Sequence, residues 1–231
     1  CGNFKTHTFT GPGTFQVTKL ALSSPNNALD YLIVAGGGGS GAREGAGGGG
    51  AGGFRETPGT STGSYTVSPI AGSVAAVTAT VNSFPIVVGA GGAGGAPGCA
   101  ENKGSNGVNS SFNSNVSTGG GGGGVGDGGG AGNPAFYGSP GGSGGASGGR
   151  IGSGCSTASK GTGNTPPTSP SQGNPGGAAK TCTSNSADAG GGGGGATATG
   201  SNAGEGGSQT AGGTVIASVG YGGVLWESST P

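Results

Sequence analysis

The sequence has little charge and no long apolar run. Lys and Arg number 8 and Asp and Glu number 8 in 231 residues, so the formal net charge is zero. A nucleic-acid-binding surface needs clustered positive charge, so this balance argues against nucleic acid as a partner. A membrane-spanning helix needs ~18 or more consecutive apolar residues, and the absence of such a run argues against a membrane span.

The residues that usually build catalytic and metal sites are scarce. His7 is the only histidine, and the four cysteines include no C-x-x-C pair, so we expect no metal and no cofactor. The run Gly141 to Gly145 matches the G-x-S-x-G nucleophile motif. In so glycine-rich a chain the match is expected by chance, and no histidine stands in a suitable order with it. The scattered carboxylates show no glycosidase-like pairing, and the chain is therefore predicted not to be an enzyme.

Glycine dominates what is present, with 66 residues against an average of about 7%. An α-helix is disfavoured because glycine costs about 1 kcal/mol at each helical position. Collagen is excluded because its three-residue repeat is broken by the hexaglycine runs at 119–124 and 190–195. Helices of the polyproline II type have no internal hydrogen bonds, and glycine lets several of them pack side by side and satisfy one another's backbone groups.

The expected fold is therefore mostly β and irregular, with little or no α-helix: an N-terminal β-module and a bundle of polyglycine II-like helices joined by loops. Alternating and apolar runs predict strands around 3–10, 14–18, 31–35, 84–88 and 214–219. The predicted division is 1–35 for N-terminal strands, 36–53 for a first glycine tract, 54–88 for an inserted β-module, 89–213 for the bundle with polar loops, and 214–231 for a closing strand and tail.

Cysteine cross-links would help a chain with a weak core. The four cysteines allow three pairings. A bond between Cys155 and Cys182 is one possibility, because it would clamp the least hydrophobic stretch and stabilise it by ~3 kcal/mol in the loop-entropy model. Disulfides favour an extracellular setting.

The most suggestive binding patch comprises Asn133, Phe136 and Tyr137, since adjacent aromatics stand in a region otherwise poor in apolar residues. Exposed aromatic side chains are common anchors for protein or sugar surfaces. The alternative is that Phe136 and Tyr137 cover the end of the glycine bundle.

The order of strands and glycine tracts resembles a known pattern. It comprises residues 9–17 (FTGPGTFQV), 31–39 (YLIVAGGGG), 50–54 (GAGGF), 86–92 (IVVGAGG) and 106–112 (NGVNSSF), with hexaglycine after the last. These runs are similar to landmarks of the glycine-rich tail-fibre and tail-tip domains of bacteriophages.

That resemblance implies a virion, extracellular protein that binds a host cell-surface protein or glycan through loops between glycine-rich helices. It also implies contacts with other virion tail proteins and a homo-oligomer, with a trimer favoured. One alternative is a purely structural virion fibre or decoration protein. Another, from a different class, is an antifreeze protein built on a polyglycine bundle.

Overall fold

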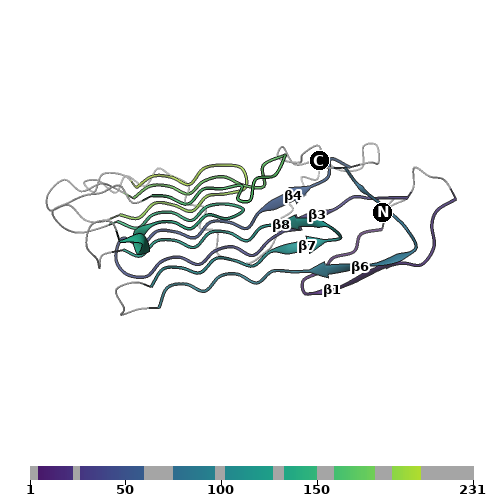
Figure 1. The fold of residues 1–231 in the computed structure, drawn as a ribbon, viewed down its shortest axis with the longest axis horizontal. Helices are drawn as coiled ribbons and strands as arrows, with labels where there is room; N and C mark the ends of the chain where they lie inside the picture. Colours follow the sequence, from purple (N-terminus) through teal and green to yellow (C-terminus); the bar gives the residue numbers. More distant parts are fainter. Residues whose placement is uncertain are drawn as a thin grey trace, which may run out of the picture.

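The molecule is an elongated slab with strands at one end and glycine-rich segments along the rest of its length (Figure 1). In the computed structural model the description covers residues 5–22, 27–59, 75–96, 102–126, 133–149, 159–179 and 189–203. The described elements are short strands, one 3-10 helix and irregular chain, with no α-helix among them. The expected fold class is thereby confirmed.

Three small antiparallel sheets form the strand end. The largest has the order β1-β6-β7-β8, and the other two are the pairs β2-β5 and β3-β4. The strands are β1 (Gly13–Val17), β2 (Ala28–Leu29), β3 (Leu32–Val34), β4 (Phe54–Glu56), β5 (Val77–Thr78), β6 (Asn82–Val87), β7 (Ser110–Phe112) and β8 (Asn115–Ser117).

An aromatic cluster holds these sheets together. Phe15 lies opposite Phe84 in the β1-β6 ladder, and Phe112 is in ring contact with both, at centroid distances of 6.2 and 5.9 Å. The ring of Tyr31 meets Phe112 edge-on at 5.8 Å. These contacts supply the apolar burial that the glycine-rich remainder of the chain lacks.

Strand pairing differs from the local pattern of the sequence. Residues 5–10 join no sheet, and β1 pairs with the distant strand β6 instead of with them. The β1-β6 pairing places Phe15 against Phe84, which buries more apolar area than a threonine-rich partner would offer. Of the described residues in 54–88, the strands β4, β5 and β6 pair with strands outside that range.

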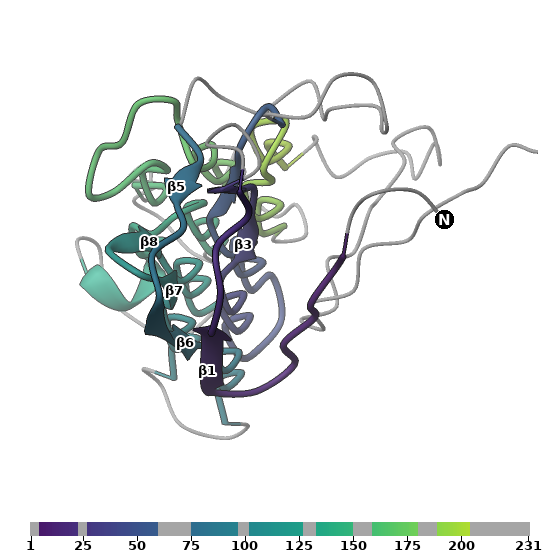
Figure 2. The same ribbon diagram turned by 90° about the vertical axis from the view of Figure 1, so that its right-hand side faces the viewer.

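Most strands at the strand end adjoin glycine-rich segments directly. β3, β6 and β8 lead into residues 35–42, 89–96 and 118–126, while residues 46–53 and 102–109 lead into β4 and β7. The further described segments are 135–141, 142–149, 159–164, 172–179, 189–195 and 198–203. They run side by side along the slab, and Figure 2 looks along them from the strand end.

Hydrogen bonds between neighbouring segments recur every three residues. Residues 35–42 donate to residues 46–53 through the amides of Ala35, Gly38 and Gly41, at donor–acceptor distances of 3.0, 2.8 and 3.0 Å. The next residue after each of the first two donors bonds to a different segment. The amides of Gly36 and Gly39 donate to the carbonyls of Val108 and Ser105. A three-residue repeat with bonds only to neighbours is the geometry of polyglycine II, as the sequence predicts.

The segments pack around a central one, residues 142–149, and every residue of this segment is buried. Its backbone bonds reach a neighbour on every side: Ser143 to Ala51, Gly144 to Asn174 and Gly145 to Ser139, with further bonds accepted from Gly121 and Gly161. The surrounding segments are 118–126, 46–53, 189–195, 172–179, 159–164 and 135–141. The arrangement is a hexagonal lattice of extended chains, here called the lattice.

Glycine is required in the lattice because the backbones lie closer than a side chain would allow. A Cβ atom added at Gly145 would overlap the carbonyl of Gly122, and one added at Gly38 would overlap that of Gly121. By contrast, a Cβ at Gly94, on the outer segment 89–96, would come no nearer than 3.8 Å to any atom. The need for glycine therefore depends on the position in the lattice.

Two asparagine side chains occupy a position where the lattice has no neighbouring segment. The Oδ1 atoms of Asn106 and Asn109 accept hydrogen bonds from the amides of Gly122 and Gly119, at 2.8 and 2.9 Å. Both glycines are buried, and an unsatisfied buried amide costs about 1–3 kcal/mol. These asparagines thus close one open side of residues 118–126.

We predict opposite effects for two alanine substitutions. Gly145→Ala should lower the free energy of unfolding by about 3 kcal/mol or more, because the methyl group overlaps backbone that cannot move independently. Gly94→Ala should leave stability unchanged or raise it by about 0.4–1 kcal/mol through the unfolded state. Thermal midpoints of the two variants measure the difference. Equal midpoints would show that the close backbone packing is not what requires glycine.

A second prediction concerns the asparagine acceptors. Asn109→Leu should lower the free energy of unfolding by about 1–3 kcal/mol, because the amide of Gly119 loses its partner. Asn109→Asp keeps an oxygen in the same place and should retain most of the stability. Chemical unfolding of both variants checks this, and comparable losses in the two would contradict the acceptor role.

Candidate functional site

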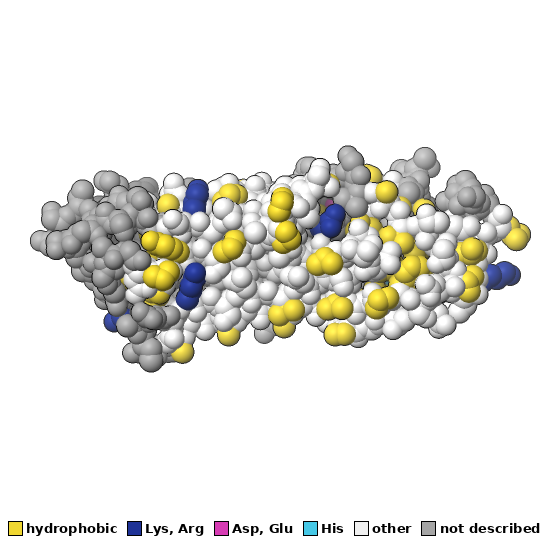
Figure 3. All heavy atoms as spheres, viewed as in Figure 1, with side chains coloured by type: hydrophobic (Ala, Val, Ile, Leu, Met, Phe, Trp, Pro, Cys, Tyr) yellow, Lys and Arg dark blue, Asp and Glu magenta, His cyan; other side chains and the backbone are white. Residues whose placement is uncertain are grey.

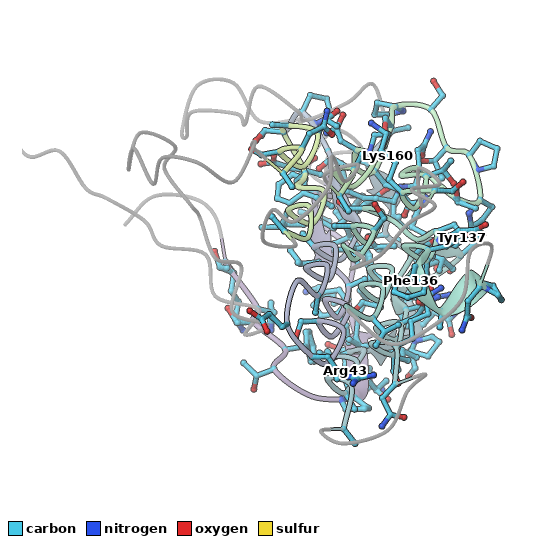
Figure 4. The ribbon with its side chains drawn as sticks, turned by 90° about the vertical axis from the view of Figure 1, so that its left-hand side faces the viewer. Arg43, Phe136, Tyr137 and Lys160 are labelled. Carbon is cyan, nitrogen blue, oxygen red and sulfur yellow. The ribbon has the colours of Figure 1, made fainter. Side chains whose placement is uncertain are left out.

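The two ends of the slab differ in character. One end is closed by the sheets, and the other, here called the loop end, is the end at which the glycine-rich segments 35–42 and 46–53 are joined by a turn. The described part of the loop end comprises the turn 43–45, residues 133–137, Lys103 and Lys160. Figure 4 looks onto this end, with Phe136 and Tyr137 lying between Arg43 and Lys160.

Arg43 is placed in an unusual backbone conformation. It follows residues 35–42 in a tight turn, with φ at 77°, and Gly45 has φ at 73°. The turn is closed by the amide of Ala46, which donates to the carbonyl of Arg43 at 3.2 Å. Residues other than glycine, asparagine and aspartate are rare at such a positive φ. Arg43 is exposed, so the turn presents a guanidinium to solvent.

A short 3-10 helix, η2 (Pro134–Phe136), builds the aromatic part of the loop end. Asn133 caps it, since its Oδ1 accepts the amide of Ala135 at 2.9 Å. The carbonyls of Ala135 and Phe136 in turn accept the amides of Val125 and Gly148, at 2.8 and 2.9 Å. The turn is therefore bonded to the lattice itself.

Phe136 and Tyr137 have different environments. The Phe136 side chain is only 3% exposed, so its ring covers the end of the bundle and is not an exposed anchor. Tyr137 is half-buried, and Asn133 already serves as the cap. Of the three residues that the sequence singles out, Tyr137 alone offers an aromatic surface to a ligand, and a binding role for the patch stays a prediction.

Lysine side chains flank this patch. The amide of Gly138, next to Tyr137, donates to the carbonyl of Ser159 at 2.9 Å, which places the exposed Lys160 beside the tyrosine. Lys103 follows Asn102, whose carbonyl accepts the amide of Ala42 just before Arg43. Burial lowers the pKa of Lys103 below its usual value of 10.5. Figure 3 shows Lys and Arg side chains toward this end of one face, and others near its middle and at the strand end.

Other residues considered from the sequence are not assembled into a site. Ser143, within the G-x-S-x-G match, is fully buried in the central segment. His7 lies in the strand end, where its ring meets Phe15 edge-on at 5.0 Å. Among the described residues, no group of His, Cys, Asp and Glu could hold a metal ion, and no helix could cross a membrane. Cys155 and Cys182 lie outside the described residues.

A family model described as a glycine-rich domain matches residues 10–230. The chain belongs to the glycine-rich domain family. The match includes both the strand end and the lattice, so a single family model covers both parts of this glycine-rich domain. Neither the curated proteins nor the solved structures compared with the chain match it.

Sequence reasoning did not select Arg43, Lys103 or Lys160. Each stands at an end of a glycine-rich segment. This position is the sequence feature that could have identified them as candidate binding residues. At an inner lattice position such as Gly145 a side chain has no space, whereas at a segment end a long side chain can extend to solvent. Charged residues that border glycine tracts could therefore have been taken as candidates.

The pKa of Lys103 leads to a stability prediction. Because burial lowers it, the ammonium form destabilises the folded state at neutral pH, and this cost disappears as pH rises toward 10.5. Lys103→Met should therefore raise the thermal midpoint at pH 7 by about 1–2 °C, a small gain because the half-exposed amine is still solvated. The gain should shrink at higher pH. Lys19→Met, at an exposed position, is the control, and a lower midpoint for Lys103→Met at pH 7 would contradict the assignment.

Proposed function

We propose that this glycine-rich domain is a non-enzymatic receptor-binding adhesin of a bacteriophage tail fibre or tail tip, acting outside the cell through its loop end. The observation that carries the proposal is the placement of Tyr137, Arg43 and Lys160 at the same end of the slab, opposite the sheets, with Tyr137 between the two cations (Figure 4). The resemblance of its strands and tracts to phage tail domains supports the same role.

The lattice suits this role because it fixes the loop end in place. Residues 133–137 are bonded to residues 118–126 and 142–149, and the turn at Arg43 closes on Ala46. A preorganised surface loses less conformational entropy on binding than a flexible one. A rigid scaffold that carries short loops is thus well matched to an adhesive contact.

The side chains at this end match host-surface chemistry. Tyrosine offers an amphipathic ring for sugar or protein contacts. The guanidinium group of arginine binds a carboxylate or phosphate group through two hydrogen bonds at once. The ligand class we propose is therefore a surface glycan or protein of the host that carries acidic groups.

The proposal predicts which substitutions weaken cell binding. The combination of Arg43→Gly, Tyr137→Ala and Lys160→Gln should weaken binding of the labelled full chain to intact bacteria at least tenfold, which corresponds to about 1.4 kcal/mol. Glycine is chosen at Arg43 because it keeps the positive φ of the turn. Binding is measured by flow cytometry over a panel of bacterial strains, together with a glycan array.

The matched control removes positive charge from the strand end, with Lys5→Gln and Lys19→Gln. This variant should bind as the unchanged chain does. The adhesive role is rejected if the chain binds none of the strains or glycans, and the loop-end assignment is rejected if both variants lose binding equally.

A further inference from the structure

One broad side of the slab is an unfinished layer of the lattice. Hydrogen bonds join its segments edge to edge, as between Gly192 and Ser201, Gly48 and Gly191, Ala35 and Gly53, and Gly92 and Gly37. The order across the layer is 198–203, 189–195, 46–53, 35–42 and 89–96. We call its outward side the flat face.

All other lattice bonds of these segments are made to a second layer, which lies on the side opposite the flat face. Residues 46–53, for example, bond to residues 118–126 and 142–149, and residues 35–42 bond to residues 102–109 and 118–126. The amides of Gly37, Ser40 and Gly49, which point away from that second layer, have no backbone partner among the described residues. They recur at the same three-residue interval as the bonds inside the lattice, so the flat face presents the pattern that another lattice layer would bind.

The side chains on the flat face would permit such an approach. The segments of the layer contain no Lys, Arg, Asp or Glu, so a covering surface would desolvate no charge. Ser40, Gly94 and Gly192 are exposed. A Cβ at Gly94 or Gly192 would find no atom nearer than 3.8 or 3.4 Å, so a second backbone could come close without displacing a side chain.

We propose that the flat face is a self-association surface, covered by the flat face of a second copy of this chain in a two-fold dimer. The lattice already accepts both parallel and antiparallel neighbours, as residues 35–42 show by accepting bonds from the parallel segment 89–96 and donating to the antiparallel segment 46–53. Segments of the partner would lie in the grooves between segments of this layer and bond to the outward amides. A two-fold axis makes one such face self-complementary.

The size of the flat face suits a dimer. Segments spaced about 4.8 Å apart, each rising about 3.1 Å per residue, give a face about 24 Å by about 22 Å. Two copies would together bury about 1,000 Å², which is near the lower limit for a specific interface. We therefore expect a reversible dimer that depends on concentration.

The test places lysine side chains on the flat face. Analytical ultracentrifugation of the full chain should show a monomer–dimer equilibrium, and Gly94→Lys with Gly192→Lys should weaken it at least tenfold while the thermal midpoint of the monomer stays unchanged. Val108→Lys is the control, because Val108 is 52% exposed on a segment outside this layer, and it should dimerise as the unchanged chain does.

Other outcomes would overturn the proposal. A chain that stays monomeric at every concentration has no such interface, and a dimer unaffected by the two lysines uses another surface. A trimer would contradict the two-fold pairing. A monomer that slows ice growth through this face, and loses that effect with the two lysines, would identify ice as the occupant. None of these results depends on the cell-binding assay, so the two proposals fail separately.

Discussion

The structure depends on the close approach of backbones that glycine permits. Each amide inside the lattice needs a carbonyl partner, and the partner comes from a neighbouring segment because a polyglycine II chain has no bonds of its own. Such bonds form only if no Cβ atom stands between the chains, as the overlap at Gly145 and Gly38 shows. Glycine loses the most conformational entropy on folding, so the lattice must satisfy its amides nearly completely, and Asn106 and Asn109 do so where no segment is present.

The strand end provides the register that glycine cannot. Identical glycines can slide past one another by three residues at little cost, whereas the pairing of Phe15 with Phe84 and the packing of Phe112 fix the register of the segments that adjoin β6 and β7, residues 89–96 and 102–109. Gln172 adds a polar connection at the junction. It is only 1% exposed, its Oε1 accepts the amide of Thr118 at 2.8 Å, and its carbonyl accepts the amide of Phe54 at 2.8 Å. The buried glutamine thus joins β4, residues 118–126 and the proline-rich loop before it.

The sequence predicted the local structure of each part of the chain better than it predicted which strands and segments lie next to one another. Apolar runs indicated β1, β3 and β6, and glycine content indicated the lattice, because both signals are local. The pairing of β1 with β6 was missed because it depends on which distant aromatic residues meet. The order of segments around residues 142–149 could not be predicted, since one glycine run does not differ from another. At the loop end, Phe136 was chosen for its ring, but its burial follows from contacts with residues 118–126 and 142–149, which only the three-dimensional arrangement brings together.

The lattice also restricts where recognition can take place. An inner position such as Gly145 admits no side chain, so its chemistry is limited to the backbone. Varied side chains fit at segment ends, where Arg43, Tyr137 and Lys160 stand, and on outer surfaces such as the one that bears Val108. For the proposed adhesin, a change of ligand would therefore require substitutions only at the loop end, and these leave the interior bonds intact. The same constraint explains why the flat face carries so few distinguishing side chains: a surface that continues the lattice must present backbone, and its specificity comes from the spacing of amides and carbonyls.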